Sequence, residues 1–407
     1  MPQRSAISAG ATLLAATLVL SACGTRGGDS TTDDSADGGK VAKIGVISPL
    51  SGDLSALGLG IQHSVELAVE QANESGDLGD WTLEVDAQDD EAKPEVGKNA
   101  ASALASDSDV IGVVGTLNSS VAESVQPVLN TAKIVMVSPA NTGPSLTRGA
   151  DAANAPKRSY ANYFRTCTTD AIQGPFAARY LYNEAGIKEL ATIHDKKTYG
   201  QGLVSAFTEE YEKLGGKIVA AETINPDDAN FNAVVSSVKA KKPAAVYYGG
   251  EYPQAGPLSQ QMKAAGLNVP LMGGDGIFSP EFIKLAGKNS TGDLATSVGA
   301  PVEDLDSAQQ FVEDYDAAGY SDPYEAYGAY AYDAANSIIN ALKVSLKDAT
   351  SAEDARQATI DAMASVKFDG ATGAVAFDEF GDNTTRILTA YAVKGGKWAP
   401  EKTDEFK

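Results

Sequence analysis

The chain has 407 residues, a formal net charge of −22 at pH 7 and 43% hydrophobic residues. A chain of this length exceeds one hydrophobic core of ordinary size, which predicts two lobes. The acidic charge favours solubility and repels phosphate backbones, so nucleic acid is excluded as an expected partner.

The first 22 residues have the layout of a lipoprotein signal peptide. Arg4 supplies a basic start, residues 9–20 form an apolar run that is short for a transmembrane helix, and two small residues precede Cys23. These small residues resemble the lipobox of bacterial lipoproteins, whose cysteine thiol receives a diacylglyceryl group and becomes the new N-terminus. We therefore expect Cys23 to anchor the protein to the outer side of the cell membrane. The alternative is an ordinary cleavage site that contains a cysteine.

Residues 23–42 are interpreted as the lipidated N-terminus and a flexible tether, because Gly, Ser, Thr and Asp dominate this stretch. The two or three acyl chains of a lipoprotein hold it to a membrane stably, whereas one chain does so only marginally. Cys167 is the only other cysteine, so no intrachain disulfide is expected.

From residue 43 onward, short β-branched runs alternate with amphipathic stretches. The first series predicts strands at residues 43–48, 83–86, 110–115 and 134–138 and a helix at residues 61–73. Ser120 and Glu123 form a capping box that predicts another helix, and Pro127 predicts that this helix is kinked or short.

A second series follows Arg165. It predicts strands at residues 190–194, 217–219, 244–248 and 271–273, separated by helical segments. The stretch after Ser297 predicts long helices at 326–346 and 352–364 and then a hairpin-like pair of strands at 374–377 and 387–393. Two alternating series predict two α/β lobes, each with a parallel sheet covered on both faces.

Small polar residues follow the expected strands directly, at the positions where α/β sheets bind ligands. Ser119 and Thr142 offer hydroxyl groups and backbone donors at helix N-termini, which suits an anionic group. Asp275 offers a fixed negative charge, which suits a cationic group. Together they predict a clamp for a zwitterion such as an α-amino acid.

The residues needed for enzyme chemistry are scarce. His63 lies opposite the apolar face of its helix, which predicts exposure to solvent, and His194 is interpreted as structural. The sequence has no nucleophile elbow, Walker loop or metal-spaced His/Cys cluster, so no catalytic residue, cofactor or metal is expected. The run Asp89-Asp90-Glu91 is compatible with metal binding, but a solvated turn is the preferred interpretation.

Three of these loops closely resemble those of the leucine/isoleucine/valine-binding proteins of branched-chain amino-acid ABC importers. The motifs are Ser138-Pro139-Ala140-Asn141-Thr142, His194-Asp195-Lys196-Lys197-Thr198-Tyr199-Gly200 and Tyr247-Tyr248-Gly249-Gly250. The similarity covers residues 41–407, and the order and spacing of the motifs behind a lipobox make it specific.

The resemblance implies an α/β fold of the periplasmic-binding protein type I class, in which two Rossmann-like lobes joined by a three-segment hinge close on the ligand. Lobe 1 would comprise residues 43–166 plus 299–377, and lobe 2 residues 167–298 plus 378–407. The three crossings would fall near residues 165–167, 297–299 and 377–378.

The resemblance also assigns roles by position. Ser119 and Thr142 match residues that hold the ligand carboxylate, and the Ala140 carbonyl, Thr142 and Asp275 match the ammonium site. Three further positions match those around the ligand side chain: Leu57, Tyr199 and Tyr327.

Some positions depart from the relatives. An aromatic residue often stands where this chain has Leu57, a tyrosine stands where it has Glu251, and the disulfide of the first lobe is replaced by Ala92 and Asn118. Two placements of Glu251 are open. We favour one that turns it to solvent at the cleft edge, because the two preceding glycines permit backbone adjustment. In the other placement, Glu251 faces inward and contacts a polar or cationic ligand side chain.

The expected function is that of a monomeric, lipid-anchored, extracytoplasmic solute-binding protein. It would capture a branched-chain (aliphatic) amino acid and deliver it to the permease of an ABC importer. The alternatives are a binder of another amino acid or amide for import or sensing, and an extracytoplasmic hydrolase, which the missing nucleophile and base disfavour.

Overall fold

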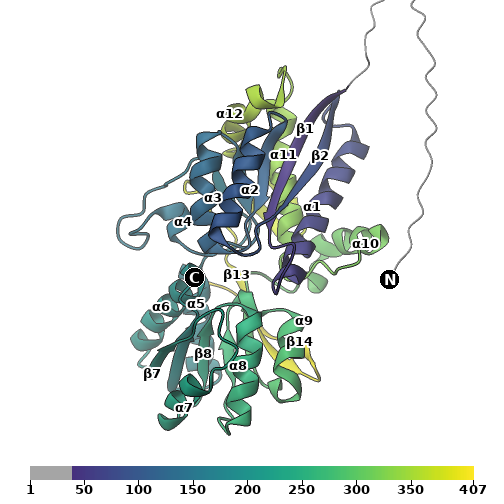
Figure 1. Cartoon of the computed structure of the whole chain (residues 1–407). Coiled ribbons are helices and arrows are strands. Elements are labelled where there is room, and N and C mark those ends of the chain that lie inside the picture. The colour runs from purple at the N-terminus through teal and green to yellow at the C-terminus, as the bar shows by residue number, and fades with distance from the viewer. Residues whose placement is uncertain (1–38) are drawn as a thin grey trace, which may run out of the picture. The chain divides into compact units, whose positions relative to one another are not determined.

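Strands and helices alternate to form two mainly parallel sheets in the computed structural model, which describes residues 39–407 (Figure 1). The expected signal peptide at residues 1–22, Cys23 and most of the tether at residues 23–42 lie outside the described residues. Within residues 39–407, no helix is long and apolar enough to cross a membrane.

The first sheet is entirely parallel and has the strand order β2-β1-β3-β4-β5. Its strands are β1 (Lys40–Ser48), β2 (Trp81–Asp89), β3 (Val110–Gly115), β4 (Val135–Ser138) and β5 (Tyr163–Arg165). The helices grouped with it are α1 (Ser55–Ser75), α2 (Pro94–Ser106), α3 (Ser119–Thr131), α4 (Ser145–Arg148), α10 (Gln309–Ala318), α11 (Gly328–Ser345) and α12 (Ala352–Met363). Both β3 and β4 are buried along their whole length, as expected for parallel strands with helices on both faces.

The second sheet has the order β14-β13-β10-β9-β8-β6-β7, parallel from β10 to β7. Its strands are β6 (Glu189–His194), β7 (Lys217–Thr223), β8 (Val246–Gly249), β9 (Leu271–Gly273), β10 (Leu294–Ser297), β13 (Ile387–Lys394) and β14 (Lys397–Glu405). Its helices are α5 (Asp170–Arg179), α6 (Thr198–Lys213), α7 (Asn232–Ala240), α8 (Tyr252–Ala264) and α9 (Pro280–Ala286). The two predicted α/β series thus correspond to two sheets, each flanked by helices (Figure 1).

The hairpin expected between residues 374–377 and 387–393 does not form. Instead β12 (Gly373–Ala376) pairs with β11 (Lys367–Gly370) in a separate two-stranded sheet. β13 pairs antiparallel with β10 on one side and β14 on the other. The sequence prediction missed β11 and β14, so the two remaining strands were wrongly paired with each other.

Three segments connect the two sheets. After β5 the chain enters α5, which packs on α6; after β10 it returns towards α10 and α11; after β12 it continues into β13. The fully buried guanidinium of Arg165 joins the first and third segments, because its Nε lies 2.8 Å from Oδ1 of Asp382. The lobe limits at residues 166, 298 and 377 stay a prediction.

Helix α3 differs from its prediction at both ends. It begins at Ser119 rather than Ser120, and its N-cap residue, Asn118, makes no side-chain cap, so the expected capping box does not form. The helix also runs past Pro127 to Thr131 and is not shortened there. The Thr131 hydroxyl donates a 2.8 Å hydrogen bond to the Pro127 carbonyl, which helps to satisfy the last turn.

Candidate ligand-binding site

Each sheet has one point where the strand order reverses, and ligand sites form beyond the carboxyl ends of the strands at such points. In the first sheet, β1 lies between β2 and β3; in the second, β6 lies between β7 and β8. The loops that follow β3, β4, β6, β8 and β9 line a common cavity, together with the starts of α1 and α11. Both reversal points therefore contribute to one site.

The cavity has about 300 Å³ of empty space, part of it open to solvent. Its lining residues are Leu57, Leu117, Asn118, Ser119, Ala140, Tyr199, Glu251, Asp275, Gly276 and Tyr327. Seven of the eight residues expected at the ligand site are in this set. The eighth, Thr142, lies outside the lining and follows Ala140 in the same loop.

Asp275 is the buried charged group of this cavity. Its carboxylate accepts hydrogen bonds from the Tyr199 hydroxyl at 2.7 Å, the Tyr327 hydroxyl at 2.9 Å and the Gln173 amide at 2.9 Å. Burial raises the pKa of Asp275, and these three hydrogen bonds lower it only in part. Neutral donors thus hold the carboxylate in place, and no Lys or Arg of residues 39–407 forms an ion pair with it.

A second buried carboxyl, that of Asp170, lies near Asp275. Asp170, at the start of α5, is fully buried, and its backbone N–H donates to the Thr142 carbonyl at 2.9 Å. Burial, followed by the negative charge of Asp275, raises the pKa of Asp170 to about 8. At neutral pH Asp170 is therefore mostly protonated, and Asp275 carries the negative charge that favours a cationic ligand group.

The opposite wall carries hydrogen-bond donors. Ser119 is the first residue of α3, and the free backbone N–H groups of a helix N-terminus favour an anion. The Asn118 side chain makes no cap hydrogen bond to these groups. The Thr142 hydroxyl is buried close to the Asp170 carboxyl. The wall can therefore hold a ligand carboxylate.

Glu251 does not turn to solvent, so the favoured expectation for this residue is wrong. It is 4% exposed and lines the cavity. Its Oε1 accepts a 2.7 Å hydrogen bond from the Asn118 amide, and its Oε2 lies 2.9 Å from the Lys197 ammonium. The ion pair and the amide compensate the cost of burying this charge, so the side chain can stay inside.

Sequence reasoning missed two supporting residues. Gln173 contacts Asp275 twice, because its amide donates to the carboxylate and its carbonyl accepts from the Asp275 backbone N–H at 2.8 Å. The sequence singles out Asn118 only as a position where relatives have a disulfide cysteine. Neither residue belongs to a recognisable sequence motif, so its place at the site becomes apparent only in the folded structure.

The remaining candidates lie outside the cavity. His63 is half-buried rather than exposed, because its ring stacks on Tyr320 at 4.6 Å between centroids. His194 accepts a 3.0 Å hydrogen bond from the Lys196 backbone. Asp90 is buried rather than part of a solvated turn, and its carboxylate accepts from the Ala92 N–H. In residues 39–407, no group of three or more His, Cys, Asp and Glu side chains is placed to hold a metal ion.

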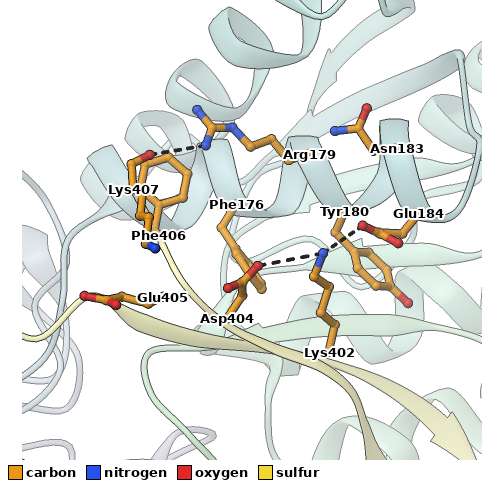
Figure 2. A pocket seen from close by; sticks show the side chains of 10 residues that line it. All are labelled: Phe176, Arg179, Tyr180, Asn183, Glu184, Lys402, Asp404, Glu405, Phe406 and Lys407. Atoms are coloured by element: carbon orange, nitrogen blue, oxygen red, sulfur yellow. Dashed lines mark hydrogen bonds and ion pairs between the residues drawn. The ribbon is translucent and has the colours of Figure 1, made fainter.

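A separate hollow lies between α5 and β14 (Figure 2). Lys402 lies 2.7 Å from Glu184 and 3.8 Å from Asp404, and Arg179 donates a 3.4 Å hydrogen bond to the Lys407 carbonyl (Figure 2). Lys402 and Arg179 are thus engaged with neighbouring groups, and none of the predicted site residues lines this hollow.

Comparison with known proteins agrees with this geometry. The sequence profile described as periplasmic binding protein matches residues 41–397. The chain belongs to this family. It is therefore a solute-binding protein of an extracytoplasmic family, and not an enzyme.

The similarity to individual relatives extends along most of each chain. A Leu/Ile/Val-binding protein of Rhizobium johnstonii is 32% identical over 87% of this chain and 92% of its own, and a Leu/Ile/Val-binding protein homolog of Brucella melitensis is 31% identical over the same shares. Among solved structures, the leucine-binding protein LivK of Thermotoga maritima is 26% identical, with a TM-score of 0.79 over 89% of this chain and 98% of its own.

The branched-chain amino acid transporter substrate-binding protein LivJ of Streptococcus pneumoniae, solved in complex with isoleucine, is also 26% identical. Its TM-score is 0.78 over 90% of this chain and 99% of its own. These structures confirm the predicted periplasmic-binding protein type I fold.

Proposed function

We propose that this protein captures a branched-chain amino acid outside the cytoplasm and delivers it to the permease of an ABC importer. The observation that carries the proposal is the Asp275 carboxylate, which is 1% exposed, lines the cavity and is held only by neutral donors. A buried carboxylate without a cation is costly, and a ligand ammonium group would compensate it.

The opposite wall fits the other charged end of an amino acid. A ligand carboxylate would accept hydrogen bonds from the start of α3 and the Ser119 hydroxyl, with the Thr142 hydroxyl close by. The Ala140 carbonyl would accept from the ammonium group together with Asp275. This pair of charged ends is the zwitterion clamp that the sequence predicts.

One part of the cavity suits an aliphatic side chain. Leu57 and Leu117 contribute apolar surface, and the rings of Tyr199 and Tyr327 add amphipathic walls while their hydroxyls bind Asp275. The relatives named as Leu/Ile/Val-binding and the isoleucine complex of the Streptococcus protein support this choice of ligand.

Thermal unfolding with and without leucine, isoleucine and valine tests the proposal directly. A ligand at a hundredfold excess over its dissociation constant should stabilise the folded protein by about 2.7 kcal/mol. Calorimetry then gives the affinities. If none of these amino acids binds, the assignment to branched-chain amino acids fails.

We also propose that Cys23 carries the membrane anchor, on the basis of the signal-like run and the small residues before it. In cells, Cys23→Ser should move the protein from the membrane fraction to the soluble extracytoplasmic fraction, while Cys167→Ser should leave it at the membrane. A Cys23→Ser variant that remains membrane-bound would disprove the anchor.

A further inference from the structure

Besides Asp275, the cavity lining contains a second pair of buried polar side chains that contact each other. It is formed by Asn118, the N-cap of α3 beside the first sheet, and Glu251, the N-cap of α8 beside the second. The Asn118 amide nitrogen donates to Glu251 Oε1 at 2.7 Å, and both side chains are about 4% exposed. A purely aliphatic ligand would find no hydrogen-bonding match at this pair.

Asn118 retains an unused acceptor. A carboxylate accepts but does not donate, so the Asn118 NH₂ group must face Glu251, and this fixes the position of its Oδ1 atom. That oxygen is buried and has no hydrogen-bond partner among the described residues. A buried acceptor left without a donor is unfavourable, so a donor on the ligand would be favoured here.

The charges around this pair argue for an uncharged donor. Lys197 lies 2.9 Å from Glu251 and neutralises it, so a cationic ligand end would compete with this ammonium group. An anionic end would meet Glu251 and the buried Asp195 behind it. A primary amide avoids both problems, because its NH₂ group can donate to Asn118 and Glu251 while its carbonyl accepts from Asn118 or Lys197.

We propose that the site binds, besides branched-chain amino acids, amino acids whose side chain ends in a primary amide, and that Asn118 and Glu251 determine this specificity. The inference rests on the amino-acid clamp of the proposed function and extends its range of ligands. Glutamine and asparagine are the probes.

Calorimetry on the unchanged protein gives the first test, with side chains of similar length: glutamine, its anionic analogue glutamate, the cationic lysine, and the apolar norleucine. Glutamine or asparagine should bind about tenfold more tightly than glutamate and lysine, and should compete with leucine for one site. If leucine binds but neither amide does, this inference is overturned and the proposed function stands. If no amino acid binds, both fail.

The second test changes the unused acceptor. Asn118→Leu keeps the side-chain size and leaves the Lys197–Glu251 pair in place, so the affinity for glutamine should fall by about tenfold more than the affinity for leucine. Asn183→Leu, at an exposed position on the hollow of Figure 2, is the matched control and should change neither affinity. Equal losses of glutamine and leucine binding in Asn118→Leu would refute a role in specificity.

Discussion

The Tyr327 hydroxyl lies 2.9 Å from Oδ2 of Asp275, so a residue at the start of α11, beside the first sheet, donates to a carboxylate that follows β9 of the second sheet. On the other side, the Tyr199 hydroxyl donates to Oδ1 at 2.7 Å. Tyr199 and Asp275 both follow strands of the second sheet, whereas Tyr327 does not. The bond from Tyr327 therefore joins Asp275, the proposed partner of a ligand ammonium group, to a helix that packs beside the first sheet.

Tyr327→Phe removes this donor and keeps the ring. Because the bond goes to a charged group, we expect ligand affinity to fall by about 1.5–3 kcal/mol. Tyr320→Phe, at a residue outside the cavity, is the control and should leave the affinity unchanged. Calorimetry with leucine measures both variants, and equal affinities in all three proteins would show that the bond does not contribute to capture.

Asp275→Asn keeps the shape of the side chain and removes its charge. A ligand ammonium group would then be buried without its partner, which costs about 3–5 kcal/mol and should abolish measurable binding of leucine. Asp348→Asn, at an exposed carboxylate, is the matched control. Unchanged affinity in Asp275→Asn would show that Asp275 does not bind the ligand ammonium group.

Asp170 should make the protein less stable as the pH rises. Its pKa is raised from 3.8 to about 8 by burial and the charge of Asp275, while Arg165 opposes the shift. Between these values the folded state binds more protons than the unfolded state, so the contribution of Asp170 is fully present below about pH 4 and is lost as the pH rises through about 8.

Urea unfolding at about pH 5 and about pH 8 measures this effect. Asp170→Asn should narrow the difference in unfolding free energy between the two conditions. The difference should not vanish, because burial also raises the pKa values of Asp90 and Glu325 to about 7. An unchanged difference would mean that Asp170 is ionised in the folded protein at both pH values.

Prediction from sequence worked best where burial leaves a simple pattern. The strands at residues 110–115 and 271–273 were predicted residue by residue, because parallel strands buried on both faces are continuous apolar runs. β14 was missed because Pro400 and its many charged residues look like a loop, although the strand lies at the edge of its sheet, where such residues are tolerated.

The residues of the candidate site also differ in how well the sequence predicts them. Ser119 and Asp275 could be predicted because they directly follow strands, where the fold rule places ligands. Tyr327 was reached only through the resemblance, since it precedes a helix far along the chain. The inward position of Glu251 could not be predicted, because it depends on Lys197 and Asn118, which come from two other loops.

Two glycines of α6 give a test of how the backbone positions this site. A methyl group on Gly200 would lie 2.4 Å from the Gly249 carbonyl oxygen and 2.3 Å from Oδ1 of Asp195, whereas one on Gly202 would meet no heavy atom within 4 Å. The close approach of α6 to β8 at Gly200 leaves no room for a side chain, and Tyr199, which binds Asp275, is the adjacent residue.

Gly200→Ala should therefore destabilise the protein by about 1–3 kcal/mol through overpacking, and it should weaken leucine binding because Tyr199 is displaced with the start of the helix. Gly202→Ala should stabilise it by about 0.5–1 kcal/mol, since alanine favours a helix interior, and should leave binding unchanged. Urea unfolding and calorimetry measure both quantities on the same preparations. Similar stability and affinity in the two variants would show that α6 can move away from β8 without cost, so that this contact does not fix the position of Tyr199.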